Sequence, residues 1–172
     1  MILRTPRLEL RELAPEDAAF ILALLNDPSF IQNIGDRGVR TMDEARDYIA
    51  NGPAASYARY GFGLYRVGLR ESGEPIGICG LLQRDALPDP DLGFAFLPAY
   101  RRQGYARESA AAVQRYARET LGVTRLLAIA NPANRPSIRL LETLGFHFEG
   151  LTRLSPDGAD LSLFAEDGRS HG

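Results

Sequence analysis

The chain has 172 residues, of which 45% are hydrophobic, and its 20 basic and 22 acidic residues leave a net charge of -2. This length and balance predict one soluble domain over residues 1–172, and they argue against a disordered chain or a nucleic-acid-binding protein with its basic excess. The longest apolar runs, such as Ala18 to Leu25, are far shorter than the roughly 20 residues of a membrane span. We therefore expect a cytoplasmic protein without membrane or nucleic-acid partners.

The residue types exclude several kinds of chemistry. All 20 basic residues are arginine, which rules out lysine Schiff bases and the phosphate-binding lysine of a glycine-rich loop. Cys79 is the single cysteine and lies in an apolar run, PIGICGLL, where a buried structural thiol is favoured over a nucleophile. With only His147 and His171 beside it, we expect no disulfide and no metal site.

The N-terminal third is expected to form one strand and two helices. The alternation in Arg7 to Glu12 predicts an exposed or edge strand. Pro15 then opens a helix whose apolar stripe ends before Asn26-Asp27-Pro28. A second helix begins at Thr41, which has capping-box spacing to Glu44, and it is expected to end at residues 51–53, Asn-Gly-Pro.

From Phe62 the apolar residues alternate. The segments 62–70 and 75–83 flank a turn-like stretch, Glu71-Ser72-Gly73-Glu74, and predict an antiparallel hairpin. A third strand, Asp91 to Leu97, follows the loop LPDPD.

The C-terminal half continues to alternate strands with helices. In order, we expect a helix after Gly104, a buried strand over 124–130, a helix capped by Asn134 and ended by Gly145, and a closing pair of strands over 146–154 and 160–164. Residues 165–172 are expected to be a loose tail. With no repeat and no linker, the order of elements predicts a single mixed α+β domain.

The stretch Tyr100 to Ala106, YRRQGYA, stands where the third strand gives way to a helix. The first turn of a helix has unpaired N–H groups and a partial positive charge, so it can bind an anion. Gly104 would let a ligand approach the backbone, and Arg101 and Arg102 add charge that suits a pyrophosphate. The alternative is a surface loop that merely carries two arginines.

The preceding strand has one nearly bare face. Leu92, Phe94 and Phe96 point one way, whereas Asp91, Gly93 and Ala95 point the other. A slender ligand arm with amide groups could lie along this backbone and pair with it as another strand would. Gly93 could instead mark a bulge, with Ala95 packed under a helix.

A third polar segment, Asn131 to Ser137, follows the next strand. Its two asparagines and its serine could contact a ligand that emerges between the two strands. Asn134 and Ser137 could equally do no more than cap the following helix.

Taken together, these segments resemble the Gcn5-related N-acetyltransferases (GNAT). Arg101-x-x-Gly104-x-Ala106 after a bare-faced strand, followed by LLAIANPANRPSIRLLETLGFHFEG, carries the resemblance. The opening TPRLELRELAPEDA is similar to the branch that acetylates the N-termini of ribosomal proteins. The resemblance covers nearly the whole chain.

The resemblance implies a GNAT fold: a mostly antiparallel sheet of six to seven strands, about four flanking helices, and acetyl-coenzyme A between the splayed fourth and fifth strands. It implies an N-acetyltransferase acting on a primary amine, which is a protein N-terminus or a small molecule, in a monomer or a homodimer. The residues expected to bind the cofactor are Phe94, Ala95, Phe96, Arg101, Arg102, Gln103, Gly104, Tyr105, Ala106, Asn131, Asn134 and Ser137.

Within the family pattern, the strand amides around Phe94 to Phe96 would polarise the thioester, and Asp91 stands where the base is commonly found. The alternative for Asp91 is a solvated carboxylate at a loop end, or an anchor for the cationic amine. The tyrosine that often donates a proton to the thiolate is replaced by Leu141, and Ser137 is our candidate donor. Arg102 stands where many members have glycine, and we expect it to have an ordinary φ.

Two other functions compete with this one. The missing tyrosine is compatible with a catalytically weak regulatory domain that only binds acyl-coenzyme A. A dinucleotide-binding module is disfavoured because the sequence has no G-x-G-x-x-G motif opening a βαβ unit.

Overall fold

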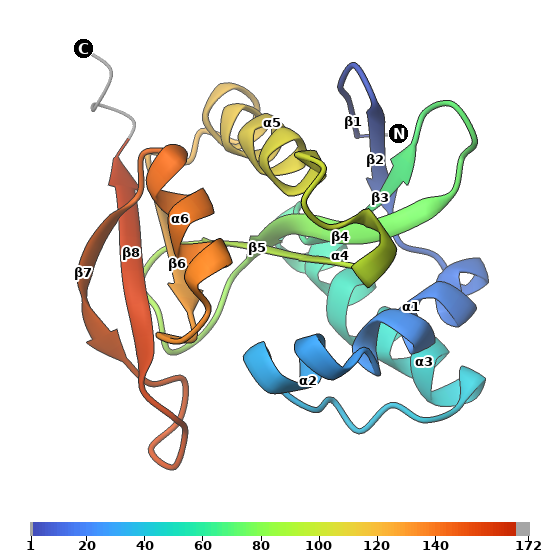
Figure 1. The fold of residues 1–172 in the computed structure, drawn as a ribbon, viewed down its shortest axis with the longest axis horizontal. Coiled ribbons are helices and arrows are strands. Elements are labelled where there is room, and N and C mark those ends of the chain that lie inside the picture. Colours follow the sequence, from blue (N-terminus) through green and yellow to red (C-terminus); the bar gives the residue numbers. More distant parts are fainter. Residues whose placement is uncertain (1, 168–172) are drawn as a thin grey trace.

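A computed structural model describes residues 2–167 of the chain. They form a mixed α+β fold (Figure 1). The strands are β1 (Leu3–Arg4), β2 (Leu8–Glu12), β3 (Leu64–Leu69), β4 (Pro75–Leu82), β5 (Asp91–Phe96), β6 (Arg125–Ala130), β7 (His147–Thr152) and β8 (Leu161–Asp167). The α-helices are α1 (Ala18–Leu25), α2 (Pro28–Asn33), α3 (Met42–Ile49), α4 (Ala55–Tyr60), α5 (Tyr105–Glu119) and α6 (Arg135–Thr143).

The strands make one sheet in the order β1-β2-β3-β4-β5-β6-β8-β7, antiparallel except where β5 meets β6. This confirms the expected fold class, with eight strands among the described residues in place of six or seven. The additional short strand β1 covers β2, so the segment expected at the edge lies inside the sheet and Leu8 and Leu10 are fully buried.

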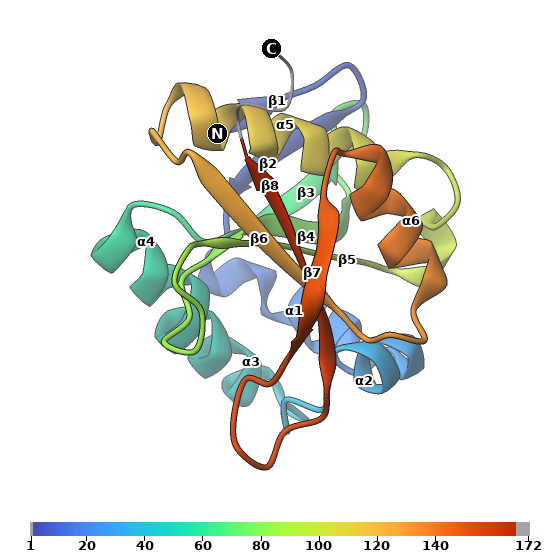
Figure 2. The same ribbon diagram turned by 90° about the vertical axis from the view of Figure 1, so that its left-hand side faces the viewer.

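Helices cover both faces of the sheet. In Figures 1 and 2, α5 lies over one face and α1, α2 and α3 lie under the other. Alternating side chains of β5 divide between the two layers. Leu92 and Phe96 belong to the core beneath α5, whereas Ala95 packs against the core of α1 and α3. The predicted alternation along this strand is therefore confirmed.

Two helix ends differ from the sequence prediction. Pro28 does stop α1, but it also opens α2, whose N-cap is Asp27. The second predicted helix does not end at residues 51–53, because the backbone continues through a π-helical turn, Ala50–Ala54, directly into α4. A wide turn tolerates Pro53, whose missing N–H would break a regular α-helix at this point.

The closing strands are confirmed, but their order in the sheet could not be predicted. The last strand, β8, inserts between β6 and β7. Residues 165–167 belong to β8, and Ala165 and Glu166 are buried, so the expected tail does not begin at 165. The rest of that tail, 168–172, lies outside the described residues. Within residues 2–167 no helix is long and apolar enough to span a membrane.

The centre of the sheet depends on close backbone contact between β3 and β4. A Cβ atom added to Gly80 would lie 2.0 Å from the carbonyl oxygen of Gly63 and 2.8 Å from the Cα atom of Leu64. These are backbone atoms in a ladder, so they cannot rotate away.

We predict that Gly80→Ala lowers the free energy of unfolding by about 3 kcal/mol or more, because the two strands must separate to admit one methyl group. Gly52→Ala is the matched control, since nothing lies within 4 Å of its added Cβ and its φ is ordinary. It should leave stability unchanged or raise it slightly. Urea denaturation of both variants tests this, and equal stabilities would contradict it.

Candidate functional site

Strands β5 and β6 meet at one point and then separate. Each has six residues, yet Asp91 and Leu127 are the only pair recorded between them in the described chain. The Leu127 N–H donates to the carbonyl oxygen of Pro90 at 2.9 Å, beside that pair. The strands are parallel, so they diverge toward Phe96 and Ala130. We call these facing strand edges, beyond the single pair, the wedge.

Backbone groups of β5 face the wedge without ladder partners. The Leu97 N–H donates to the Ile76 carbonyl oxygen on the β4 side at 2.9 Å. Peptide groups alternate in direction along an antiparallel strand, so those of Phe94 and Phe96 point the other way, toward β6. The Phe96 carbonyl oxygen already accepts from Arg101. The wedge therefore presents the N–H and carbonyl groups of Phe94 and the N–H of Phe96 to any extended amide chain placed there.

Helix α5 begins at the mouth of the wedge with an open N-terminus. Its N-cap is Gly104, which has a φ of 82° and offers no side-chain cap. The first-turn amides, beginning with Tyr105 and Ala106, have no carbonyl groups of a preceding helical turn to bond with. An anion at this point would meet both unpaired N–H groups and the positive end of the dipole.

Arg101 does not lie free beside this helix start. Its Nε and Nη2 atoms donate to the Phe96 carbonyl oxygen at 3.1 and 2.9 Å, and Nη2 also contacts Asp27 Oδ2 at 2.6 Å. The guanidinium is thus already bonded within the protein. These contacts favour an arginine that holds the loop, and a direct contact of Arg101 with a ligand stays a prediction.

Arg102 has a φ of 61°, the one positive φ of a non-glycine residue in the described chain. The expected ordinary φ is therefore wrong. This left-handed conformation costs an L-residue roughly 1–2 kcal/mol. The side chain is exposed and makes no ion pair within residues 2–167, so its charge remains available at the helix start.

The residues that hold this loop from the other side were not predicted from the sequence. Arg7 Nε contacts Glu108 Oε1 at 2.7 Å, and its Nη1 donates to the Gln103 carbonyl oxygen at 3.0 Å. The guanidinium also lies 4.3 Å from the centre of the Tyr105 ring. Thr5 donates to Glu108 Oε2 at 2.5 Å. A contact across about 100 residues leaves no local pattern, so nothing short of the fold could reveal it.

The segment after β6 forms a cap at the other side of the mouth. Asn134 accepts from the Ser137 N–H at 3.4 Å, and its Nδ2 donates to Ser137 Oγ at 3.1 Å. Asn131 Oδ1 accepts from the Ala133 N–H at 3.0 Å. The capping interpretation of Asn134 is thus confirmed. Because Ser137 Oγ accepts this bond, its own hydroxyl proton remains free to be donated elsewhere.

Asp91 lies at the closed end of the wedge and is 1% exposed, which contradicts the alternative of a solvated loop-end carboxylate. Its Oδ1 accepts from Arg84 Nε at 3.0 Å, while its Oδ2 has no hydrogen-bond partner in the described structure. Burial raises the pKa of Asp91, and the charge and hydrogen bond of Arg84 offset this only in part. The neighbouring Asp89 pairs with Arg125 at 3.6 Å, so the acids of this loop do not form an unpaired cluster.

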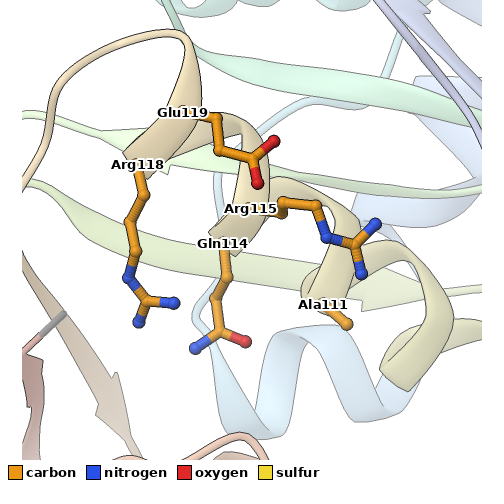
Figure 3. A pocket seen from close by; sticks show the side chains of 5 residues that line it. All are labelled: Ala111, Gln114, Arg115, Arg118 and Glu119. Atoms are coloured by element: carbon orange, nitrogen blue, oxygen red, sulfur yellow. The ribbon is translucent and has the colours of Figure 1, made fainter. Parts of the chain in front are cut away.

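The predicted site residues therefore lie along the wedge and in the two loops at its mouth. The loops 97–104 and 131–134, which lead to α5 and α6, follow the diverging ends of the parallel strands, and Asp91 lies where these strands meet. A pocket of about 350 Å³ lies elsewhere, on the flank of α5, with Gln114 and Arg118 among its lining residues (Figure 3). It contains none of the predicted site residues.

The remaining reactive side chains do not contribute to this site. Burial raises the pKa of Cys79 to about 12, which makes it a structural thiol, as expected. His147 is exposed on β7, and His171 lies outside the described residues. In residues 2–167 no group of three or more His, Cys, Asp and Glu side chains could hold a metal ion.

Comparison with known proteins adds an independent finding. The family described as acetyltransferase (GNAT) domain matches residues 7–147. The uncharacterized N-acetyltransferase YoaA of Bacillus subtilis (strain 168) is 29% identical over 154 residues, which cover 88% of this chain and 86% of that protein.

Solved structures have the same fold. An acetyltransferase of Agrobacterium tumefaciens str. C58 is similar with a TM-score of 0.78 at 28% identity, over 95% of this chain and 92% of that chain. RimL, a ribosomal L7/L12 alpha-N-protein acetyltransferase in complex with coenzyme A, has a TM-score of 0.81 at 19% identity, over 96% of this chain and 97% of that chain.

The strain at Arg102 generates a prediction about stability. Arg102→Gly should raise the free energy of unfolding by about 0.5–1 kcal/mol, because glycine adopts a φ of 61° freely and this gain exceeds its entropic cost in the unfolded chain. Arg102→Ala removes the same charge but keeps the strain, so it should match the wild type. Chemical denaturation distinguishes them, and an Arg102→Gly protein less stable than Arg102→Ala would contradict the assigned conformation.

Proposed function

Because the chain belongs to the GNAT acetyltransferase family, we propose that it binds acetyl-coenzyme A along the wedge and transfers the acetyl group to a primary amine. The observation that carries this proposal is the uncapped N-terminus of α5 at the mouth of two strands that share a single pair. An anion-binding helix end beside unpaired strand edges suits a ligand with a pyrophosphate and an extended amide arm.

The pyrophosphate would lie on the backbone amides from Arg102 to Ala106. Gly104 leaves this surface without a side chain, and the Arg102 guanidinium supplies charge. Gln103 is exposed but donates from Nε2 to the Ala99 carbonyl oxygen at 2.9 Å, so it would contribute through its backbone. Arg101 would not bind the pyrophosphate directly, since its guanidinium is already bonded and its N–H donates to the Pro98 carbonyl oxygen at 3.3 Å.

The amide arm would lie in the wedge against Phe94, Ala95 and Phe96. The peptide groups that point toward β6 would pair with it, and the N–H groups would also be placed to polarise a carbonyl oxygen. On the other side, Asn131 and Asn134 stand at the start of α6. When bound, acetyl-coenzyme A supplies an activated thioester, while the residues of this chain orient it and handle protons.

Asp91 is the proposed base. It lies at the closed end of the wedge, and its buried Oδ2 has no partner in the described structure, so it could accept a proton from an incoming ammonium group or from a bridging water. A carboxyl group whose pKa is raised by burial is a better base near neutral pH than an ordinary aspartate. Its negative charge would also hold the cationic amine.

Ser137 is the proposed proton donor for the thiolate. Its hydroxyl accepts a bond from Asn134, which leaves its proton directed elsewhere. Leu141, which replaces the tyrosine of other members, is apolar and 1% exposed, so it belongs to the core and can donate nothing.

The proposed acceptor class, a primary amine, follows from the GNAT family and from the negative charge of Asp91. The relative YoaA is named an N-acetyltransferase, and RimL is named a ribosomal L7/L12 alpha-N-protein acetyltransferase. A protein N-terminus and a small-molecule amine are therefore both candidates here. A panel of peptides, polyamines and amino acids would identify which one this chain prefers.

We predict that Gly104→Ala raises the Kd for coenzyme A about tenfold or more, because a side chain at a φ of 82° strains the proposed phosphate-binding backbone and its Cβ would lie 3.2 Å from Arg7 Nη2, which holds the loop. Gly122→Ala is the matched control: its φ is 70°, so the strain is similar, but it lies after the C-terminal end of α5. Calorimetry gives both constants. Wild-type affinity in a folded Gly104→Ala protein would place the pyrophosphate elsewhere.

We predict that Asp91→Asn lowers kcat/KM for the best amine about 100-fold at neutral pH while leaving coenzyme A affinity unchanged. In the wild type, activity should fall as the pH drops through the raised pKa of Asp91, because protonation removes the base. The variant should lose this dependence and recover at high pH, where the free amine becomes abundant. Asp47→Asn, an exposed change on α3, is the control.

These rates, measured as release of free coenzyme A, also test the alternative of a weakly catalytic acyl-coenzyme A-binding domain. That alternative requires cofactor binding without turnover on any amine of the panel. A wild-type pH profile in Asp91→Asn would remove Asp91 from the mechanism but would leave the acetyltransferase proposal intact.

A further inference from the structure

We propose that Arg101 and Asp27 are a positioning pair: their contact fixes the loop that binds the cofactor and joins it to helix α2, although neither side chain touches the cofactor. This inference rests on the proposed function, because it concerns how the proposed pyrophosphate site is held. We call residues 97–104 the α5 loop.

The contacts of Arg101 tie together three parts of the chain. Its guanidinium donates twice to the carbonyl oxygen of Phe96, the last residue of β5, and once to Asp27, 74 residues earlier. Arg101 itself is in the α5 loop, directly before the strained Arg102. One planar, rigid side chain thus holds the middle of the loop against the end of the strand and against Asp27.

Asp27 is well placed to hold this arginine. It is 8% exposed and is the N-cap of α2, where its Oδ2 accepts from the Phe30 N–H at 3.2 Å and from Ser29 Oγ at 2.8 Å. Burial alone would raise the pKa of Asp27, but hydrogen bonds from Arg101, Ser29 and one backbone amide outweigh it and hold the pKa below its ordinary value. The carboxylate is therefore ionised throughout the neutral range.

The pair also connects the α5 loop to the core on the α1–α3 face of the sheet. Phe30 of α2 is buried in the core that also contacts Ala95 and Leu97, which is the face of β5 toward which Asp91 alternates. The α5 loop lies at the end of the same strand. An altered position of α2 would therefore change the α5 loop through Asp27 and Arg101.

Removing Asp27 has opposite expected effects on cofactor binding if Arg101 positions the loop and if Arg101 contacts the phosphates directly. If the guanidinium bound the ligand, removing Asp27 would release it from a competing carboxylate and would strengthen cofactor binding or leave it unchanged. If the pair positions the α5 loop, removing Asp27 must weaken binding even though Asp27 repels phosphate. The sign of the change therefore decides between the two.

The central experiment is Asp27→Ser, titrated with coenzyme A by calorimetry. Serine is as good an N-cap as aspartate, so α2 keeps its cap, but its short, neutral side chain cannot pair with Arg101. We expect the Kd to rise about tenfold, the size of a typical coupling between residues in contact. Ser29→Ala is the matched control, because it removes one hydrogen bond to Asp27 and leaves the ion pair; its Kd should stay at the wild-type value.

Rescue by lysine separates positioning from direct contact. Arg101→Met should weaken coenzyme A binding, and Arg101→Lys should restore part of the loss, but only while Asp27 is present to pair with the ammonium group. Each of these changes should raise the KM for the cofactor and leave kcat at saturating cofactor nearly unchanged. A lysine that rescues equally well in the Asp27→Ser background would overturn the proposal and assign Arg101 to the phosphates.

The binding measurements distinguish failure of the proposed function from failure of the positioning pair. If the wild-type protein does not bind coenzyme A at millimolar concentration, the proposed function itself fails. If the wild type binds and Asp27→Ser binds equally well or more tightly, only the positioning pair fails. Thermal denaturation with and without coenzyme A confirms that each variant is folded, because a ligand that binds the native state alone raises Tm.

Discussion

The pairing of β5 with β6 at one residue pair is the constraint on which the site depends. Had these two parallel strands remained in register, their backbone groups would have been consumed by the ladder. Because they separate after Asp91 and Leu127, peptide groups at the centre of the sheet remain without partners in a neighbouring strand. This opening is the feature on which the proposed cofactor site depends. The helices that follow the two strands then begin at the same mouth.

Arginine supplies the positive charge at this mouth, and two of its arginines, Arg7 and Arg101, are engaged in the fold. Arg7 holds α5 and the Gln103 carbonyl oxygen from one side, and Arg101 holds the strand end and α2 from the other. Planar guanidinium groups suit this work because they form several hydrogen bonds in fixed directions. Arg102 is the exception: it accepts an unfavourable φ and leaves its charge exposed.

Electrostatics at the closed end of the wedge follow from burial. Asp91 and Arg84 form an ion pair that is taken out of water on the aspartate side, with one carboxylate oxygen left without a hydrogen bond. A half-satisfied buried carboxylate is poorly stabilised as an anion, which is why its pKa rises. The missing hydrogen bond and the burial thus cost stability and also raise the affinity of the Asp91 carboxylate for a proton.

The sequence by itself determined the fold class, the hairpin of β3 and β4, the alternation along β5, and the two helix starts at Gly104 and Asn134, because each is written in local periodicity or in the residue next to a helix end. The tertiary structure alone decided what the charged side chains do. Arg101 pairs with Asp27, and Arg7 contacts the α5 loop, through contacts between segments 74 or more residues apart. Asp91 is buried because other segments cover the start of its strand. Local sequence patterns carry no information on any of these contacts. The left-handed φ of Arg102 belongs with them: no local propensity favours it, and the loop adopts it because its two ends are fixed by the rest of the fold.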